Sequence, residues 1–212
     1  MIARLTPTRG LIFTEVEMYV EHLQRKFPNS IRSYFTHNLS IPHCFNALVE
    51  EAIQEQDNEF FFFIEEDTVP PEGVFEQMLE ACQDENVIAC VDYGFNGGSN
   101  TVAINTSGEI IFSGFGCTMM KRRVFEKLGS PYFRADKGFN LSNKQWYSTD
   151  PNKVYGMYDV EFGFRARENG FKFVQIPGEC RHLQLIQLGE KMSNLGVHNI
   201  GEKDKITKRI VL

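Results

Sequence analysis

The chain has 212 residues, which is long enough for one domain with a sizeable core. Its 42% hydrophobic and 24% charged residues are ordinary for a soluble globular protein, and its net charge of −6 argues against non-specific coating of nucleic acid. The five cysteines are widely spaced and form no CxxC pair, which argues against a disulfide framework and a zinc site. No long apolar run indicates a membrane span, and no signal-peptide pattern indicates secretion, so we expect a cytoplasmic protein.

Strand-like and helix-like segments alternate through residues 1–91. Apolar segments predict strands at 1–5, 30–35, 60–64 and 87–91, and helical spacing predicts helices between them at 14–27, 42–56 and 70–82. Thr14 and Glu17 form a capping-box pattern at the start of the first helix. The alternation predicts a three-layer α/β/α sandwich with a mostly parallel central sheet.

The pattern changes in the second half of the chain. After a segment rich in glycine and asparagine at 94–100, we expect a hairpin at 101–105 and 109–112, helices at 122–128 and 159–168, a strand at 171–176, a further segment at 180–187 and a peripheral tail at 190–212. The long polar loop 130–157 is a candidate lid. In that loop, Trp146 and Tyr147 either stack on an acceptor sugar or base, or anchor the loop by one buried ring.

Three acidic residues follow the apolar run 60–64 directly. Glu65, Glu66 and Asp67 would therefore lie at the carboxyl edge of a parallel sheet, where open α/β folds bind ligands. Alternation along a strand would point Glu65 and Asp67 the same way and Glu66 the other way. Two converging carboxylates favour a hard cation, Mn²⁺ or Mg²⁺, that also holds a diphosphate. The alternative is a solvated loop in which Asp67 begins a turn.

A second acidic pair opens the predicted helix 159–168. Asp159 and Glu161 suit a helix start on structural grounds alone, because acids are favoured there. The functional alternative is a general base, since a carboxylate held at a helix start can take a proton from an attacking hydroxyl.

The order of these motifs carries a family resemblance. The sequence runs from Thr-Pro-Thr-Arg at 6–9, through Phe-Phe-Phe-Phe-Ile-Glu-Glu-Asp at 60–67 and Ser-Gly-Phe-Gly-Cys at 113–117, to Tyr-Asp-Val-Glu-Phe at 158–162 and His182. Over about residues 1–185 it resembles the nucleotide-sugar-dependent glycosyltransferases of the GT-A fold, most like the large family 2. The resemblance implies one catalytic domain at 1–185, with a nucleotide-binding half at 1–92 and an acceptor half at 93–185, and a C-terminal extension at 186–212.

The resemblance also implies roles for individual residues. Asp159 would be the catalytic base, and Glu65, Asp67 and His182 would be the metal ligands. Contacts with the nucleotide sugar are implied for Thr6, Pro7, Thr8, Arg9, Asn46, Glu66, Gly114 and Gly116. Three positions depart from the family pattern: Glu65 stands where Asp is usual, Tyr158 stands where an acid usually precedes the base, and Phe45 replaces an arginine before Asn46.

The expected activity is metal-dependent transfer of a sugar from a nucleotide diphosphate to an acceptor hydroxyl, with inversion if Asp159 is the base. The acceptor would be a glycan, a small molecule or, as an alternative, hydroxymethylated DNA bound along basic segments at 121–123 and 203–209. A GT-A-like binding domain without activity and a metal-dependent phosphohydrolase or nuclease are the other classes that the carboxylates allow.

Overall fold

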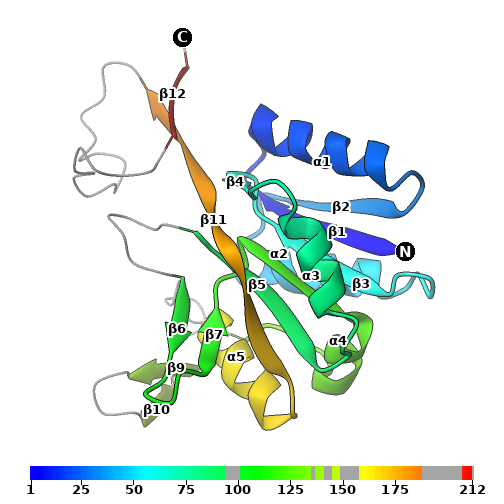
Figure 1. Cartoon of the computed structure of the whole chain (residues 1–212). Coiled ribbons are helices and arrows are strands. Elements are labelled where there is room, and N and C mark those ends of the chain that lie inside the picture. The colour runs from blue at the N-terminus through cyan, green and yellow to red at the C-terminus, as the bar shows by residue number, and fades with distance from the viewer. Residues whose placement is uncertain (94–100, 135–136, 141–144, 149–157, 188–206, 212) are drawn as a thin grey trace.

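The computed structural model describes residues 1–93, 101–134, 137–140, 145–148, 158–187 and 207–211, and its centre is an eight-stranded sheet (Figure 1). The strands are β1 (Ile2–Thr8), β2 (Ile31–His37), β3 (Phe60–Ile64), β4 (Thr68–Val69), β5 (Val87–Tyr93), β8 (Cys117–Lys121), β11 (Lys172–Gln187) and β12 (Thr207–Val211). Their order is β12-β11-β5-β8-β3-β1-β2, and β4 pairs with β11. Only β8 and β4 are antiparallel to their neighbours, which confirms the predicted mostly parallel sheet.

Helices cover both faces of this sheet (Figure 1). The first face packs against α1 (Thr14–Lys26) and α3 (Val74–Ala81), and the second packs against α2 (His43–Ala52), α4 (Arg122–Leu128) and α5 (Tyr158–Glu168). Strand β3 supplies both cores, because its side chains alternate. Phe60, Phe62 and Ile64 join the core beneath α1 and α3, whereas Phe61 and Phe63 join the core beneath the other three helices. The predicted α/β/α sandwich is therefore confirmed.

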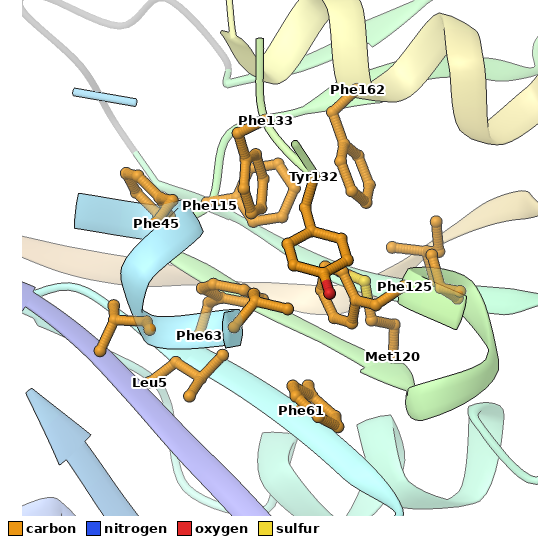
Figure 2. Close-up of a cluster of buried hydrophobic side chains, with 14 of the residues drawn as sticks. Leu5, Phe45, Phe61, Phe63, Phe115, Met120, Phe125, Tyr132, Phe133 and Phe162 are labelled. Atoms are coloured by element: carbon orange, nitrogen blue, oxygen red, sulfur yellow. The ribbon is translucent and has the colours of Figure 1, made fainter. Parts of the chain in front are cut away.

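The second core is largely aromatic (Figure 2). Phe133 stacks on Phe162 of α5 with ring centroids 5.0 Å apart, and it meets Phe115 edge-on at 4.9 Å. Phe115 in turn lies 5.1 Å from Phe63 of β3. Aromatic pairs at these distances are stabilising beyond their buried area. They fix the start of α5, and so Asp159, relative to the end of β3.

Two small hairpins lie outside the central sheet. Strand β6 (Val102–Ile104) pairs with β7 (Ile110–Ser113), as predicted, and β9 (Lys137–Asn140) pairs with β10 (Gln145–Ser148) inside the predicted loop. Trp146 lies opposite Phe139 in that second hairpin, and both interpretations of its ring stay predictions.

Three local predictions need correction. No side-chain cap holds the start of α1, and Glu17 instead binds the buried Arg4 of β1. The segments 171–176 and 180–187 form one continuous strand, β11, because a register shift between Gln175 and Glu179 accommodates the Pro-Gly pair between them. Strand β8 was not predicted.

The C-terminal strand β12 lies within the predicted extension and pairs in parallel with β11. The boundary at residue 185 and the division of the chain at residue 92 stay predictions. In the part of the chain that the structure describes, no helix has the length and apolar character needed to cross a membrane.

Candidate functional site

The acidic run lies in a tight turn at the carboxyl end of β3. Strand β3 ends at Ile64, and the Thr68 amide closes the turn by donating to the Glu65 carbonyl at 3.3 Å. The strand alternation predicted for the acids therefore does not apply. Glu66 and Asp67 both turn toward Arg9, so the predicted opposite orientation of these two side chains is wrong.

Arg9, in the loop after β1, binds the side chains of this turn. Its Nε donates to Glu66 Oε1, its own amide donates to Glu66 Oε2 at 2.6 Å, and its Nη2 donates to Asp67 Oδ2 at 3.1 Å. The two carboxylates are buried, but the Arg9 side chain is 81% exposed. Burial lowers the pKa of the Arg9 guanidinium, but the surrounding carboxylates outweigh that effect and raise it overall.

Strand β11 brings His182 to the other side of Asp67. Strand β4, which follows the turn, pairs His182 with Thr68, and this pairing sets His182 Nε2 3.3 Å from Asp67 Oδ2. The ring of Tyr93 packs against the imidazole edge-on at 5.8 Å. Burial lowers the pKa of His182, but the hydrogen bond and charge of Asp67 raise it above the ordinary value.

Glu65 differs from its two neighbours because it keeps partial solvent access. Its amide donates to the Gly116 carbonyl at 3.1 Å, which links the turn to the loop before β8. Burial and the nearby charge of Asp67 raise the pKa of Glu65, and His182 and Arg9 offset only part of this rise. A carboxyl group in these surroundings takes up a proton more readily than one in water.

Two buried tyrosines connect the turn with Asp159. The pKa of Tyr93 is raised well above its ordinary value by burial and by the charges of Glu65, Asp159 and Asp67. The pKa of Tyr158 is raised by burial and by Glu65 and Asp159. Contacts show the same connection: the Glu65 amide donates to the Gly116 carbonyl at 3.1 Å, and the Gly116 amide donates to the Tyr93 hydroxyl at 3.3 Å. Phe115, the residue before Gly116, has its ring centroid 6.2 Å from that of Tyr158, which directly precedes Asp159. The structure therefore links acids that lie far apart in the sequence.

Asp159 itself is partly exposed in the first turn of α5. Burial raises its pKa to about 6, although the amides of Val160 and Asp159 stabilise the charged form. One of these bonds runs from the Val160 amide to Oδ1 at 2.8 Å. A carboxyl group with a pKa near neutrality suits a general base.

The second acid of that helix has a structural role. Glu161 is buried and accepts two hydrogen bonds from Arg165, at 3.0 and 3.2 Å. Arg165 also donates to the carbonyls of Leu128 and Tyr132. Arg165 therefore ties Glu161 to the segment between α4 and Phe133.

Solved structures similar to this chain identify the architecture. The crystal structure of A197 from STIV matches with a TM-score of 0.61 at 17% identity, over 86% of this chain and 85% of that one. The chain has a GT-A-like fold. A weaker match is GalNAc-T7, crystallised with UDP, GalNAc and Mn²⁺, with a TM-score of 0.48 at 8% identity over 83% of this chain and 36% of that one. The sequence matches no protein-family profile and no curated protein.

In this structure the residues of the candidate site do not form a metal centre. Within the described residues, no group of three or more His, Cys, Asp and Glu side chains is arranged to hold a metal ion. Two of the three predicted ligands, Asp67 and His182, are paired with each other, and Oδ2 of Asp67 is shared between His182 and Arg9. A hard cation needs carboxylate oxygens as ligands, so it would compete with these bonds for Oδ2 of Asp67.

Several residues with predicted nucleotide contacts have bonds within the scaffold, and their contacts with a nucleotide stay predictions. Thr6 is fully buried and accepts from Arg4 Nε at 3.0 Å, so its side chain is not open to a ligand in this conformation. The Thr8 hydroxyl accepts from the Gly10 amide at 2.8 Å and donates to the Leu11 carbonyl at 3.1 Å. Pro7 is half-buried between them in β1. These bonds shape the loop that carries Arg9.

Asn46 on α2 also has a structural role. Its amide group donates to the Phe133 carbonyl at 2.8 Å and accepts from the Phe133 amide at 2.9 Å. This pair holds Phe133 in the aromatic core beside Phe115. A contact between Asn46 and a nucleotide sugar stays a prediction.

Tyr93 is a site residue that the sequence interpretation missed. Its hydroxyl accepts from the Gly116 amide at 3.3 Å, and its ring leaves no room for side chains at Gly114 and Gly116. The signal available in the sequence was its place at the end of a parallel strand, where such sheets position ligand-binding groups. The two glycines accommodate Tyr93, and their predicted contact with the donor sugar stays a prediction.

We expect Gly116→Ala to destabilise the fold by about 1–3 kcal/mol, because an added Cβ would lie 2.6 Å from Tyr93 Cε1. Urea denaturation measures the loss. In a Tyr93→Ala background the same substitution should cost clearly less. An equal cost in both backgrounds would contradict the steric explanation.

Proposed function

We propose that this protein is a glycosyltransferase that uses a nucleotide-diphosphate sugar as donor and a hydroxyl group as acceptor. The GT-A-like fold supports the class of donor. The observation that carries the proposal is that the loop at Phe115 and Gly116 contacts the acidic turn, Tyr93 and Tyr158, the residue that precedes Asp159. One part of such a site can hold the diphosphate while the other faces the acceptor.

In the proposed reaction, Asp159 acts on the acceptor. Its carboxylate takes the proton of the acceptor hydroxyl, and the oxygen attacks the anomeric carbon of the sugar. A new glycosidic bond forms as the bond from that carbon to the diphosphate breaks, and the nucleoside diphosphate leaves with both bonding electrons. Attack from the opposite face inverts the anomeric configuration.

The DNA alternative gains no support from the basic segment at 121–123. Lys121 pairs with Glu59 at 3.2 Å, Arg122 pairs with Glu126 at 2.7 Å, and Arg123 pairs with Glu85. Residues 203–206 of the second basic segment lie outside the described residues. The side chains of Lys121 and Arg122 are also only 18% and 16% exposed, so they present little accessible charge to a nucleic-acid backbone.

The test is donor turnover without a known acceptor. The protein is incubated with a panel of nucleotide sugars, in EDTA and separately in Mn²⁺ or Mg²⁺, and products are separated by chromatography. Release of a nucleoside diphosphate together with free sugar supports the proposal, because water then replaces the acceptor. Cleavage between the two phosphates would indicate a phosphohydrolase instead. Raised thermal stability without any product would indicate a domain that binds nucleotide sugars but lacks activity.

We expect activity to increase with pH as a single group, Asp159, loses its proton. Only the deprotonated carboxylate can accept a proton from the acceptor, and burial raises the pKa of Asp159 to about 6. At pH 5 about one tenth of the groups would be ionised, and above pH 7 the rate should reach a plateau. The measurement is kcat/KM for donor turnover between pH 4.5 and 8. A profile that is flat or falls over this range contradicts Asp159 as the base.

A further inference from the structure

In this site the carboxylates of Glu66 and Asp67 face the guanidinium of Arg9. We infer that Arg9 binds the donor diphosphate directly and takes the place of the divalent metal that the sequence predicts. This inference rests on the proposed function and concerns how the same site holds its donor.

Hydrogen bonds to Glu66 and Asp67 hold the Arg9 guanidinium in a fixed orientation. Glu66 receives two bonds from it, one from Nε and one from its backbone amide, and Asp67 receives a third from Nη2. The side chains of Glu66 and Asp67 are only 8% and 12% exposed, so the partners of the guanidinium are themselves buried in the fold. A guanidinium fixed in this way loses little further freedom when a ligand binds.

The opposite edge of the guanidinium is open. The Arg9 side chain is 81% exposed, and no residue in the described ranges partners its Nη1. Arginine has five N–H donors, of which the carboxylates use two, one on Nε and one on Nη2. The remaining three lie on adjacent nitrogens, which is the arrangement that binds two phosphate oxygens at once.

The loop around Arg9 is braced in the same way. The Thr8 hydroxyl bonds on both sides, and the Asn38 amide donates to the Thr8 carbonyl at 3.1 Å. The Phe13 amide donates to the Glu66 carbonyl at 3.0 Å, which ties the start of α1 to the acidic turn. Arg9 is thus attached to the turn by its side chain, its amide and the chain that follows it.

A metal ion would have to compete with these bonds. Oδ2 of Asp67 is already shared by Arg9 at 3.1 Å and His182 at 3.3 Å, so a metal held by the predicted ligands Asp67 and His182 would have to displace these bonds. The inference follows from this competition for oxygens.

Calorimetric titration of the full chain with pyrophosphate, UDP, GDP, ADP and CDP tests the inference, first in EDTA and then in Mn²⁺. We expect at least one nucleoside diphosphate to bind in EDTA, and Arg9→Ala to weaken that binding by about 10–100-fold, which is the range expected for loss of charge-assisted hydrogen bonds. Arg9→Lys should be intermediate, because an ammonium cannot span two phosphate oxygens. The control is Arg25→Ala, which removes an arginine of similar exposure (77%) from α1 and should change nothing.

The outcomes separate the two proposals. If the wild-type chain binds nucleoside diphosphates only with Mn²⁺ and turns over nucleotide sugars only with Mn²⁺, the inference is overturned and the proposed function stands. If no nucleotide sugar or nucleoside diphosphate binds under either condition, both fall. A further measurement uses only the wild-type chain, so it does not depend on whether the variants fold. Mn²⁺ alone is added, and its binding is monitored by the decrease of the paramagnetic resonance signal of free Mn²⁺. Binding of one Mn²⁺ per chain would also overturn the inference.

Discussion

Replacing Asp159 with asparagine should lower the rate of sugar transfer by about 10²–10⁴-fold, which is the usual contribution of a positioned general base. Asparagine keeps the shape of the side chain, and its oxygen can still accept the Val160 amide, so α5 should begin as before. Donor affinity should stay within about twofold, because the lost interaction belongs to the transition state. The measurement is kcat and KM for donor turnover together with direct titration of the donor.

Asp57→Asn is the matched control for this variant. Asp57 is an exposed aspartate that pairs with Arg32 at 3.1 Å, away from the acidic turn and from α5. Its substitution should leave turnover unchanged. The residual activity of Asp159→Asn should also lose the pH dependence near 6. Full turnover in Asp159→Asn would instead assign the proton transfer to another group, and Glu65 is the next carboxylate in this neighbourhood with partial solvent access.

The fold could be predicted where local patterns decide the structure. Strand β3 is five consecutive apolar residues and was predicted with both ends correct, and α4 ends where Gly129 takes a positive φ of 69°. Strand β8 was missed because its place between β3 and β5, antiparallel to both, depends on pairing with distant strands. No periodicity within Cys117–Lys121 carries that information.

The sequence predicts which acidic residues belong to the candidate site better than it predicts their hydrogen-bond partners. The acids after β3 and the acid opening α5 were recognised because their places at a strand end and a helix start are local features. Their partners were not, because Arg9 and Glu66 are separated by 57 residues and meet only in the folded sheet. The predicted orientation of Glu66 failed for a local reason: the strand ends at Ile64, and a turn does not keep strand alternation.

The two carboxylates that open α5 also show why sequence position alone does not assign a role. Asp159 and Glu161 are two residues apart in the same helical turn. Asp159 keeps solvent access and has no basic partner among the described residues, whereas Glu161 is buried against Arg165. The difference comes from Arg165, one turn later on the same helix, which the i to i+4 spacing places beside Glu161.

Replacing Arg165 with methionine should therefore destabilise the protein by about 3–5 kcal/mol, which is the usual cost of leaving a buried charge without its partner. Glu161 would remain with its side chain 8% exposed and no cation beside it, and the carbonyls of Leu128 and Tyr132 would lose their donor. Denaturation in urea measures the change. The variant should also impair donor turnover at temperatures where it is still folded, because Arg165 ties α5, and with it Asp159, to the segment before Phe133.

The double variant Glu161→Leu/Arg165→Met separates the buried charge from the lost carbonyl bonds. It removes both charges at once, so it should recover much of the stability lost in Arg165→Met, since an ion pair replaced by apolar side chains often costs little. The part that it does not recover measures the two unpaired carbonyls, at about 1–3 kcal/mol for each buried group left unsatisfied. Equal losses in the single and double variants would mean that the carbonyl bonds, and not the charge of Glu161, fix the start of α5 against the aromatic core.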